Sequence, residues 1–120
     1  MAKQVISTAH APAAIGPYSQ AILCGNALYA SGQIAPDAGD VAAQTEKAFD
    51  SIEAILSEAG FSLSDVVKTT VYLTDMNDFA KVNEVYARRM AQPYPARSCV
   101  QVGALPKKAL VEIEVLAQKC

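Results

Sequence analysis

Apolar side chains recur at helical spacing in the first long patterned stretch of the chain. It runs from Val41 to Ala59, where apolar residues stand three or four positions apart along most of its length. Asp40, just before it, is a residue type that caps helix N-termini, and Gly60 readily adopts the left-handed conformation that ends a helix. The pattern therefore predicts a helix over residues 41–59, preceded by a turn at 36–40.

A second helical stripe follows a capping residue at Asp75 or Asn77 and extends to about Met90. The side chains expected on its buried face are Phe79, Val82, Val85, Tyr86 and Met90. Pro93 and Pro95 bias the residues before them toward extended geometry, which is consistent with a helix that ends near Met90.

Alternation with a period of two predicts strands on either side of these helices. The clearest cover residues 66–74, 97–102 and 110–118, and residues 19–24 and 27–33 flank Gly25-Asn26, a two-residue hairpin signal. Residues 3–8 are expected to form a short first strand. The order βββαβαββ, with two helices on one face of the sheet, predicts a two-layer α+β domain whose other face needs a cover, most simply a partner subunit.

Composition narrows the class of protein. The 120 residues are 52% hydrophobic and 18% charged, which predicts a single domain over residues 1–120. A net charge of −2 argues against a nucleic-acid binder, and no stretch approaches membrane-spanning length. The three cysteines lack CxxC or zinc spacing, and no secretory signal precedes them, so we expect free thiols, no metal site and a cytoplasmic location.

Arg97 is the candidate for recognising an anion, because a guanidinium held by a strand can grip a carboxylate with two hydrogen bonds. It shares one strand face with Cys99 and Gln101, while the opposite face, which carries Val100 and Val102, is expected to meet the core. The alternative is a solvated arginine on a strand edge.

A carboxylate on the last strand is the natural partner of Arg97. Glu112 or Glu114 could deprotonate a water, although both could equally be surface glutamates. Serine-hydrolase and phosphate-binding motifs are absent, and Cys99 has no evident histidine base, so its backbone N–H is a more plausible anion donor than its thiol is a nucleophile. Tyr18, which ends an apolar loop, either contacts a substrate or packs.

Several segments, read together, resemble one family along nearly the whole chain. The segments are Ala11-Pro12-Ala13-Ala14-Ile15-Gly16-Pro17-Tyr18-Ser19-Gln20-Ala21, Tyr29-Ala30-Ser31-Gly32-Gln33-Ile34, Val67-Lys68-Thr69-Thr70-Val71-Tyr72-Leu73, Asn77-Asp78-Phe79, Val82-Asn83-Glu84-Val85-Tyr86, Pro95-Ala96-Arg97-Ser98-Cys99-Val100 and Val111-Glu112-Ile113-Glu114. Together they closely resemble the deaminase-active branch of the Rid family, the reactive intermediate deaminases also called YjgF proteins.

The resemblance implies a chorismate-mutase-like fold, a homotrimer with clefts between its subunits, and an activity that needs no cofactor. That activity is hydrolysis of 2-imino acids and their enamine tautomers, such as 2-aminoacrylate, 2-iminopropanoate and 2-iminobutanoate, to 2-keto acids and ammonia. By position, Arg97 would pair with the substrate carboxylate and Glu112 would hold or activate water. Cys99 would give mainly a backbone donor, and the pocket would be shaped by Tyr18, Ser31, Gly32 and Asn83.

The chain departs from the family pattern between Ile34 and Val41, where it is roughly six residues shorter and lacks a hairpin-like excursion. Two other functions stay open. One is a trimeric module that binds small molecules or regulates without turnover. The other is the ribonuclease or translation-inhibitor activity associated with the family, which the acidic charge balance disfavours.

Overall fold

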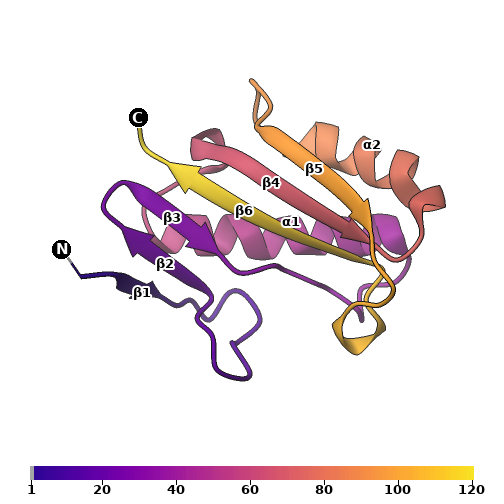
Figure 1. Cartoon of the computed structure of the whole chain (residues 1–120), viewed down its shortest axis with the longest axis horizontal. Coiled ribbons are helices and arrows are strands. Elements are labelled where there is room, and N and C mark those ends of the chain that lie inside the picture. The colour runs from indigo at the N-terminus through magenta and orange to yellow at the C-terminus, as the bar shows by residue number, and fades with distance from the viewer. Residues whose placement is uncertain (1) are drawn as a thin grey trace.

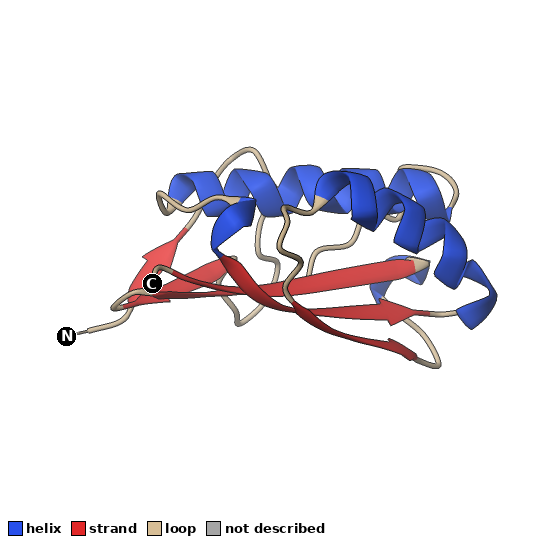
Figure 2. Cartoon of the chain, turned by 90° about the horizontal axis from the view of Figure 1, so that it is seen from above, coloured by secondary structure: helices blue, strands red, loops and turns tan. Residues whose placement is uncertain are grey.

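The computed structural model describes residues 2–120 and has two layers, a six-stranded sheet and two helices (Figure 1). Both helices lie on the same face of the sheet (Figure 2). In chain order the elements are β1 (Gln4–Ile6), β2 (Ala21–Cys24), β3 (Ala27–Ala30), α1 (Val41–Glu58), β4 (Val66–Leu73), α2 (Phe79–Arg89), β5 (Ala96–Gln101) and β6 (Val111–Gln118). The predicted order βββαβαββ and the α+β class are confirmed.

The sheet is mixed, with the strand order β1-β2-β3-β6-β4-β5. Only β4 and β5 pair in parallel, as expected for strands joined by a crossover helix, here α2. The other neighbours pair antiparallel. This order places β6 in the middle of the sheet and leaves β5 at one edge.

The long helix α1 begins and ends where its capping residues predict. The Asp40 side chain accepts a hydrogen bond from the backbone N–H of Ala43 at 2.9 Å, and Gly60 has a φ of 79° just beyond the end. The helix buries Phe49, Ile52 and Leu56 against the sheet, among other side chains. The predicted helix over residues 41–59 is confirmed to within one residue.

The second helix starts later than its first capping candidate. Asp75 accepts a hydrogen bond from the backbone N–H of Asn77 at 2.9 Å, but this cap opens a short 3₁₀ turn, and α2 itself begins at Phe79. Val82, Val85 and Tyr86 are buried as predicted. Phe79 is 37% exposed, so it belongs to the rim of the stripe rather than to the core.

The face of β5 that meets the core is the reverse of the one predicted. Arg97 and Cys99 pair with Thr69 and Val71, two fully buried residues on the helix-covered face of β4. Val100 points the other way and is 43% exposed. The prediction was wrong because β5 is an edge strand, where the aromatic rings of α2 pack against Arg97 and where Cys99, instead of a valine, packs against the core.

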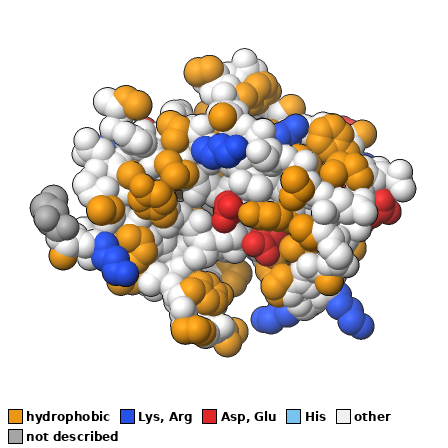
Figure 3. Space-filling model, viewed as in Figure 1, with side chains coloured by type: hydrophobic (Ala, Val, Ile, Leu, Met, Phe, Trp, Pro, Cys, Tyr) orange, Lys and Arg blue, Asp and Glu red, His pale blue; other side chains and the backbone are white. Residues whose placement is uncertain are grey.

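The face of the sheet away from the helices is uncovered, and we call it the open face. Figure 3 views this face and shows apolar side chains spread over it, with acidic side chains near its middle. Residues that pair across β1, β2, β3 and β6 form a row on this face. Two members of the row, Val5 and Tyr29, are 62% and 52% exposed. Exposed apolar surface of this kind is typical of an interaction site, and the cover expected for this face stays a prediction.

Arg89 joins the two helices. Its guanidinium bonds to the carboxylates of Glu46, Asp50 and Glu53 on α1 at 2.7 to 2.8 Å, and it lies 5.5 Å from the centroid of the Phe49 ring. Burial alone would lower the pKa of Arg89, but the hydrogen bonds from Glu46, Glu53 and Asp50 raise it. One residue therefore carries most of the polar contact between α1 and α2.

Replacing Arg89 with alanine is expected to lower the free energy of unfolding by about 2 kcal/mol, because three carboxylates lose their shared, largely buried cation. The matched control is Arg88→Ala, since Arg88 is 57% exposed and contacts Glu46 alone. That change is expected to cost no more than about 0.5 kcal/mol. Urea denaturation at equal protein concentration measures both, and equal losses would contradict this role for Arg89.

Candidate active site

The residues predicted to form the site fall into two groups in the structure. Arg97, Asn83 and Cys99 lie together where β5 meets α2. The other group is associated with the open face and the loop beside it, and its members are Tyr18, Ser31, Gly32 and Glu112.

Arg97 is held in place by α2. Its Nη1 donates a hydrogen bond to Oδ1 of Asn83 at 2.7 Å, and its guanidinium carbon lies 4.8 Å from the centroid of the Tyr86 ring and 5.6 Å from that of Phe79. Contacts of this kind orient the planar fork without neutralising its charge. Within residues 2–120, no carboxylate forms a salt bridge with Arg97. The side chain is therefore a preorganised cation with capacity for an anion.

Cys99 lies beside Arg97 on the same face and packs against the hydrophobic core. Burial raises the pKa of its thiol, and the nearby charge of Arg97 only partly opposes this. A thiol with a raised pKa is a poor nucleophile. The geometry thus disfavours a covalent role for its sulfur.

Glu112 lies on the open face of β6, half-buried, and pairs in register with Tyr72 of β4. Burial raises the pKa of its carboxyl, and the neighbouring charge of Glu114 raises it further. The carboxyl packs directly against Gly32, where a Cβ would overlap its oxygen and come within 2.9 Å of its Cγ. A glycine is thus required at position 32 for the carboxyl to stand where it does.

Tyr18 and Ser31 line an open cavity of about 500 Å³ on the open face, and Glu114, but not Glu112, is also part of its wall. The Ser31 hydroxyl donates to the backbone carbonyl of Ser19 at 2.6 Å, which ties β3 to the loop that carries Tyr18. Tyr18 itself is 53% exposed.

Gln20 holds this loop, although sequence reasoning does not place it among the candidate site residues. Its side-chain amide donates to the carbonyls of Thr8 and Pro12 at 3.2 and 2.8 Å, and its oxygen accepts from the backbone N–H of Thr8 at 2.7 Å. The only hint in the sequence is a polar residue placed in an apolar stretch, and here it is buried. The apolar loop owes its shape to this one side chain.

Arg97 and Glu112 lie on opposite faces of the sheet. Arg97 pairs with Thr69, which faces the helices, and Glu112 pairs with Tyr72, which faces away from them. Successive residues of a strand point to opposite faces, so the three-residue step from Thr69 to Tyr72 changes the face. One chain by itself therefore does not bring the guanidinium and this carboxyl together.

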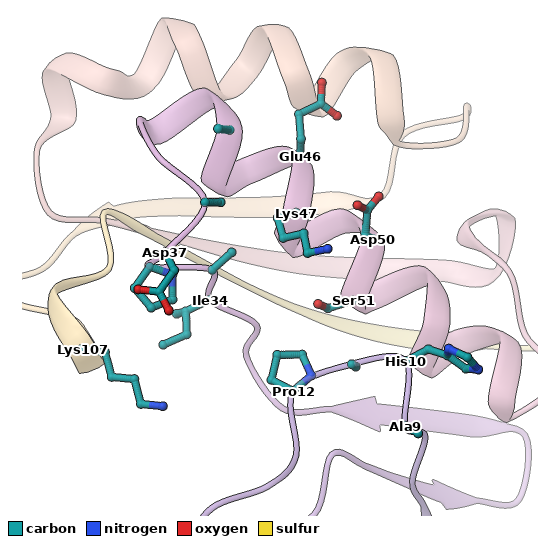
Figure 4. A pocket seen from close by; sticks show the side chains of 15 residues that line it. Ala9, His10, Pro12, Ile34, Asp37, Glu46, Lys47, Asp50, Ser51 and Lys107 are labelled. Carbon is teal, nitrogen blue, oxygen red and sulfur yellow. The ribbon is translucent and has the colours of Figure 1, made fainter.

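A larger cavity, of about 980 Å³, lies between α1, the loop at residues 9–12 and the segment 34–38 (Figure 4). Neither Arg97 nor Glu112 lines it. The carboxylates of Glu46 and Asp50 point away from its apolar wall at Ile34, and both bond to Arg89. Glu46 and Asp50 are therefore already paired, while Asp37 and His10 also line the cavity.

Residues 8–119 match the family model described as Endoribonuclease L-PSP. The chain belongs to this family. This match, together with a solved RidA structure of the same fold, confirms the resemblance to the Rid family that the sequence shows.

Relatives in the L-PSP family match along nearly their whole length. The chain is 53% identical to a RutC family protein of Pyrococcus horikoshii, with 98% of each chain covered. It is 48% identical to the human protein named 2-iminobutanoate/2-iminopropanoate deaminase, covering 96% of this chain and 89% of that one. It is 46% identical to the Escherichia coli protein of the same name, covering 95% and 96%.

Solved structures agree with the fold. RidA from the Antarctic bacterium Psychrobacter sp. superposes with a TM-score of 0.93 at 49% identity, covering 97% of this chain and 99% of that one. E. coli TdcF with bound serine superposes with a TM-score of 0.90 at 41% identity, covering 98% and 99%.

The alignment with the Pyrococcus protein spans 124 positions, four more than this L-PSP family chain has residues. The relative therefore has at least four residues without a counterpart here. The difference has the direction expected from the shortened segment after Ile34.

No helix within residues 2–120 is long and apolar enough to cross a membrane.

Replacing Glu112 with glutamine is expected to raise the thermal unfolding midpoint at about pH 7.5 and to leave it nearly unchanged at about pH 3. The fold raises the pKa of Glu112, so its ionised form is less favourable in the folded than in the unfolded chain. Stability is therefore lost as the pH rises through the unfolded and then the folded pKa. Glu84→Gln on the exposed surface of α2 is the control. A midpoint that falls at the higher pH would contradict this electrostatic account.

Proposed function

We propose that this protein is a cofactor-independent deaminase that hydrolyses 2-imino acids and their enamine tautomers to 2-keto acids and ammonia. The substrate class comprises 2-aminoacrylate, 2-iminopropanoate and 2-iminobutanoate. The observation that carries the proposal is Arg97, a cation fixed by Asn83 and the Tyr86 ring that has no carboxylate partner among the described residues 2–120. Relatives named 2-iminobutanoate/2-iminopropanoate deaminase support the activity.

The site lies between subunits in this proposal. Arg97 and Glu112 face opposite sides of one sheet, so a cleft that contains both needs Arg97 from one chain and Glu112 from another. The exposed apolar side chains of the open face favour its burial against other copies. We adopt the homotrimer that the family resemblance implies, with the open faces turned inward.

Catalysis would need little beyond positioning and one proton carrier. Arg97 grips the substrate carboxylate, and a water adds through its oxygen to the electrophilic carbon of the protonated imine while Glu112 accepts a proton from the water and the C=N electron pair moves to nitrogen. Glu112 then returns that proton to the nitrogen of the resulting carbinolamine. The C–N bond breaks as the oxygen electron pair forms the keto C=O, the hydroxyl proton is released, and nitrogen leaves as ammonia or ammonium.

The other predicted residues act around these two groups. Asn83 orients Arg97, and the backbone N–H of Cys99 is a donor for substrate oxygen. Tyr18 and Ser31 border the cavity that Glu114 lines, and Gly32, next to Ser31 in the chain, leaves the room that the Glu112 carboxyl needs. The burial that raises the pKa of Glu112 suits a group that must both accept and donate a proton near neutral pH.

A coupled assay tests the activity. A pyridoxal-phosphate dehydratase generates 2-aminoacrylate from serine and 2-iminobutanoate from threonine, and keto-acid release is followed with and without the protein. We expect acceleration that is lost in Arg97→Ala. A folded protein that binds 2-ketobutyrate by calorimetry but accelerates neither reaction would contradict the deaminase proposal and favour a binding module.

A further inference from the structure

Three side chains on two neighbouring strands of the open face form what we call the acid cluster: Tyr72 on β4 and Glu112 and Glu114 on β6. The two glutamates are separated by one residue, so they point to the same face with Cβ atoms about 7 Å apart. Both are half-buried. The Tyr72 hydroxyl donates to Oε1 of Glu114 at 3.0 Å, and Tyr72 stands opposite Glu112 in the β4–β6 register.

The hydrogen bond from Tyr72 fixes Glu114 while leaving Glu112 without a donor from the same ring. It joins residues 42 positions apart in the sequence. It also raises the pKa of Tyr72, because loss of the phenol proton would break the bond and place a second negative charge beside Glu114. Tyr72 therefore remains a hydrogen-bond donor across the ordinary working range of pH.

Within one chain, the charges around the acid cluster leave the repulsion between its glutamates uncompensated, and in the proposed assembly Arg97 of another chain enters the site to pair with the substrate carboxylate. Lys68 on β4 faces the same side, but its amine donates to the Ser98 hydroxyl on β5 at 3.1 Å. Lys3 lines the cavity next to Glu114, together with the phenols of Tyr18 and Tyr29. Within residues 2–120, neither glutamate forms a salt bridge. The charged neighbour that acts on Glu112 is thus a second carboxylate.

We propose that Glu114 is a positioning residue of the deaminase site: anchored by Tyr72 on the same face of β6 as Glu112, it tunes the proton transfer that Glu112 carries out. This inference rests on the proposed function, since it assigns Glu112 the transfer of a proton. In this proposal Glu114, although it lines the cavity with Tyr18 and Ser31, acts through Glu112 and not on the substrate. It acts only by changing how readily Glu112 gives up and takes back a proton.

The reaction explains why such a partner is useful. Glu112 must take a proton as water adds and return the same proton as the amine leaves, and a carboxyl that ionises too readily is weak in both steps. Burial supplies part of the effect, but the carboxyl must also remain reachable by water. A second carboxylate held at fixed distance strengthens the proton affinity of Glu112 without sealing the site.

Glu114→Gln tests the proposal because glutamine keeps the size of the side chain and an oxygen that can accept from Tyr72. The titration of Glu112 is followed by NMR in protein labelled with carboxyl-¹³C glutamate, and its signal is identified by its loss in Glu112→Gln. We expect the Glu112 midpoint to move to lower pH in Glu114→Gln and, by a smaller step, in Tyr72→Phe. Glu114→Asp, which keeps the charge, should retain most of the wild-type behaviour.

Kinetics supply the second readout. In Glu114→Gln we expect the acid limb of the pH profile of kcat/KM to move to lower pH and kcat to fall roughly three- to tenfold, with KM nearly unchanged because Arg97 is intact. A Glu112 titration that does not move overturns the role of Glu114, even where imine hydrolysis is present. A Glu112 titration that moves in a protein without imine hydrolysis leaves the coupling standing but overturns the proposed function and, with it, the catalytic role of the coupling.

Discussion

Arg97→Lys is expected to lower kcat/KM for 2-iminobutanoate by about 100-fold while the fold stays intact. Lysine keeps the positive charge but replaces the planar fork with a single ammonium, which cannot form two parallel hydrogen bonds with a carboxylate. Asn83 and the Tyr86 ring, which orient the guanidinium, also cannot orient a lysine side chain in the same way. Loss of one strong charge-assisted hydrogen bond accounts for a change of this size.

The matched control for Arg97→Lys is Arg88→Lys, at an exposed arginine on the outside of α2. It should change kcat/KM by less than about twofold, because surface substitutions far from the site are nearly neutral. Circular dichroism and thermal unfolding are used to check that both variants fold. Should Arg97→Lys retain activity within about threefold of the unchanged protein, the fork would not be the substrate anchor.

Gly32→Ala is expected to reduce kcat by about 100-fold, a loss of the size that follows when a catalytic group is displaced by about 1 Å. The added methyl group would occupy space now held by the Glu112 carboxyl, so the carboxyl has to turn away. The backbone at Gly32 does not require a positive φ, so the cost comes from this contact and not from the main chain.

Two comparisons isolate the effect of Gly32→Ala. Gly103→Ala adds a methyl group where nothing lies within 4 Å, and activity should stay close to that of the unchanged protein. In a Glu112→Gln background, Gly32→Ala should cost much less than it does alone, because the two changes disable the same group. Equal losses in both backgrounds would show that Gly32→Ala damages the sheet instead of the position of Glu112.

The sequence predicted the elements of the fold well where local signals agree. For α1, the apolar spacing, the Asp40 cap and the glycine stop all point to the same boundaries, and the structure has them. Alternation on β6 likewise separates the buried Val111 and Ile113 from Glu112. Local patterns fail on β5, because alternation shows which residues share a face but not which face of an edge strand is covered.

The residues of the candidate site could be named from the sequence, but their arrangement could not. Whether Arg97 and Glu112 meet depends on the register of β4 with both β5 and β6, and strands far apart in sequence set that register. The contact between Tyr72 and Glu114 has the same origin. Neither arrangement leaves a trace in the spacing of residues along the chain.

Mixing two inactive variants tests the central claim, that one site takes Arg97 and Glu112 from different chains. Arg97→Ala and Glu112→Gln are each assayed alone, then unfolded, combined in equal amounts and refolded, and imine hydrolysis is measured. In closed rings that assemble at random, about a quarter of the sites combine an unsubstituted Arg97 from one chain with an unsubstituted Glu112 from another. We therefore expect about a quarter of normal activity. A mixture no more active than the separate variants would place both groups within one chain and contradict the account.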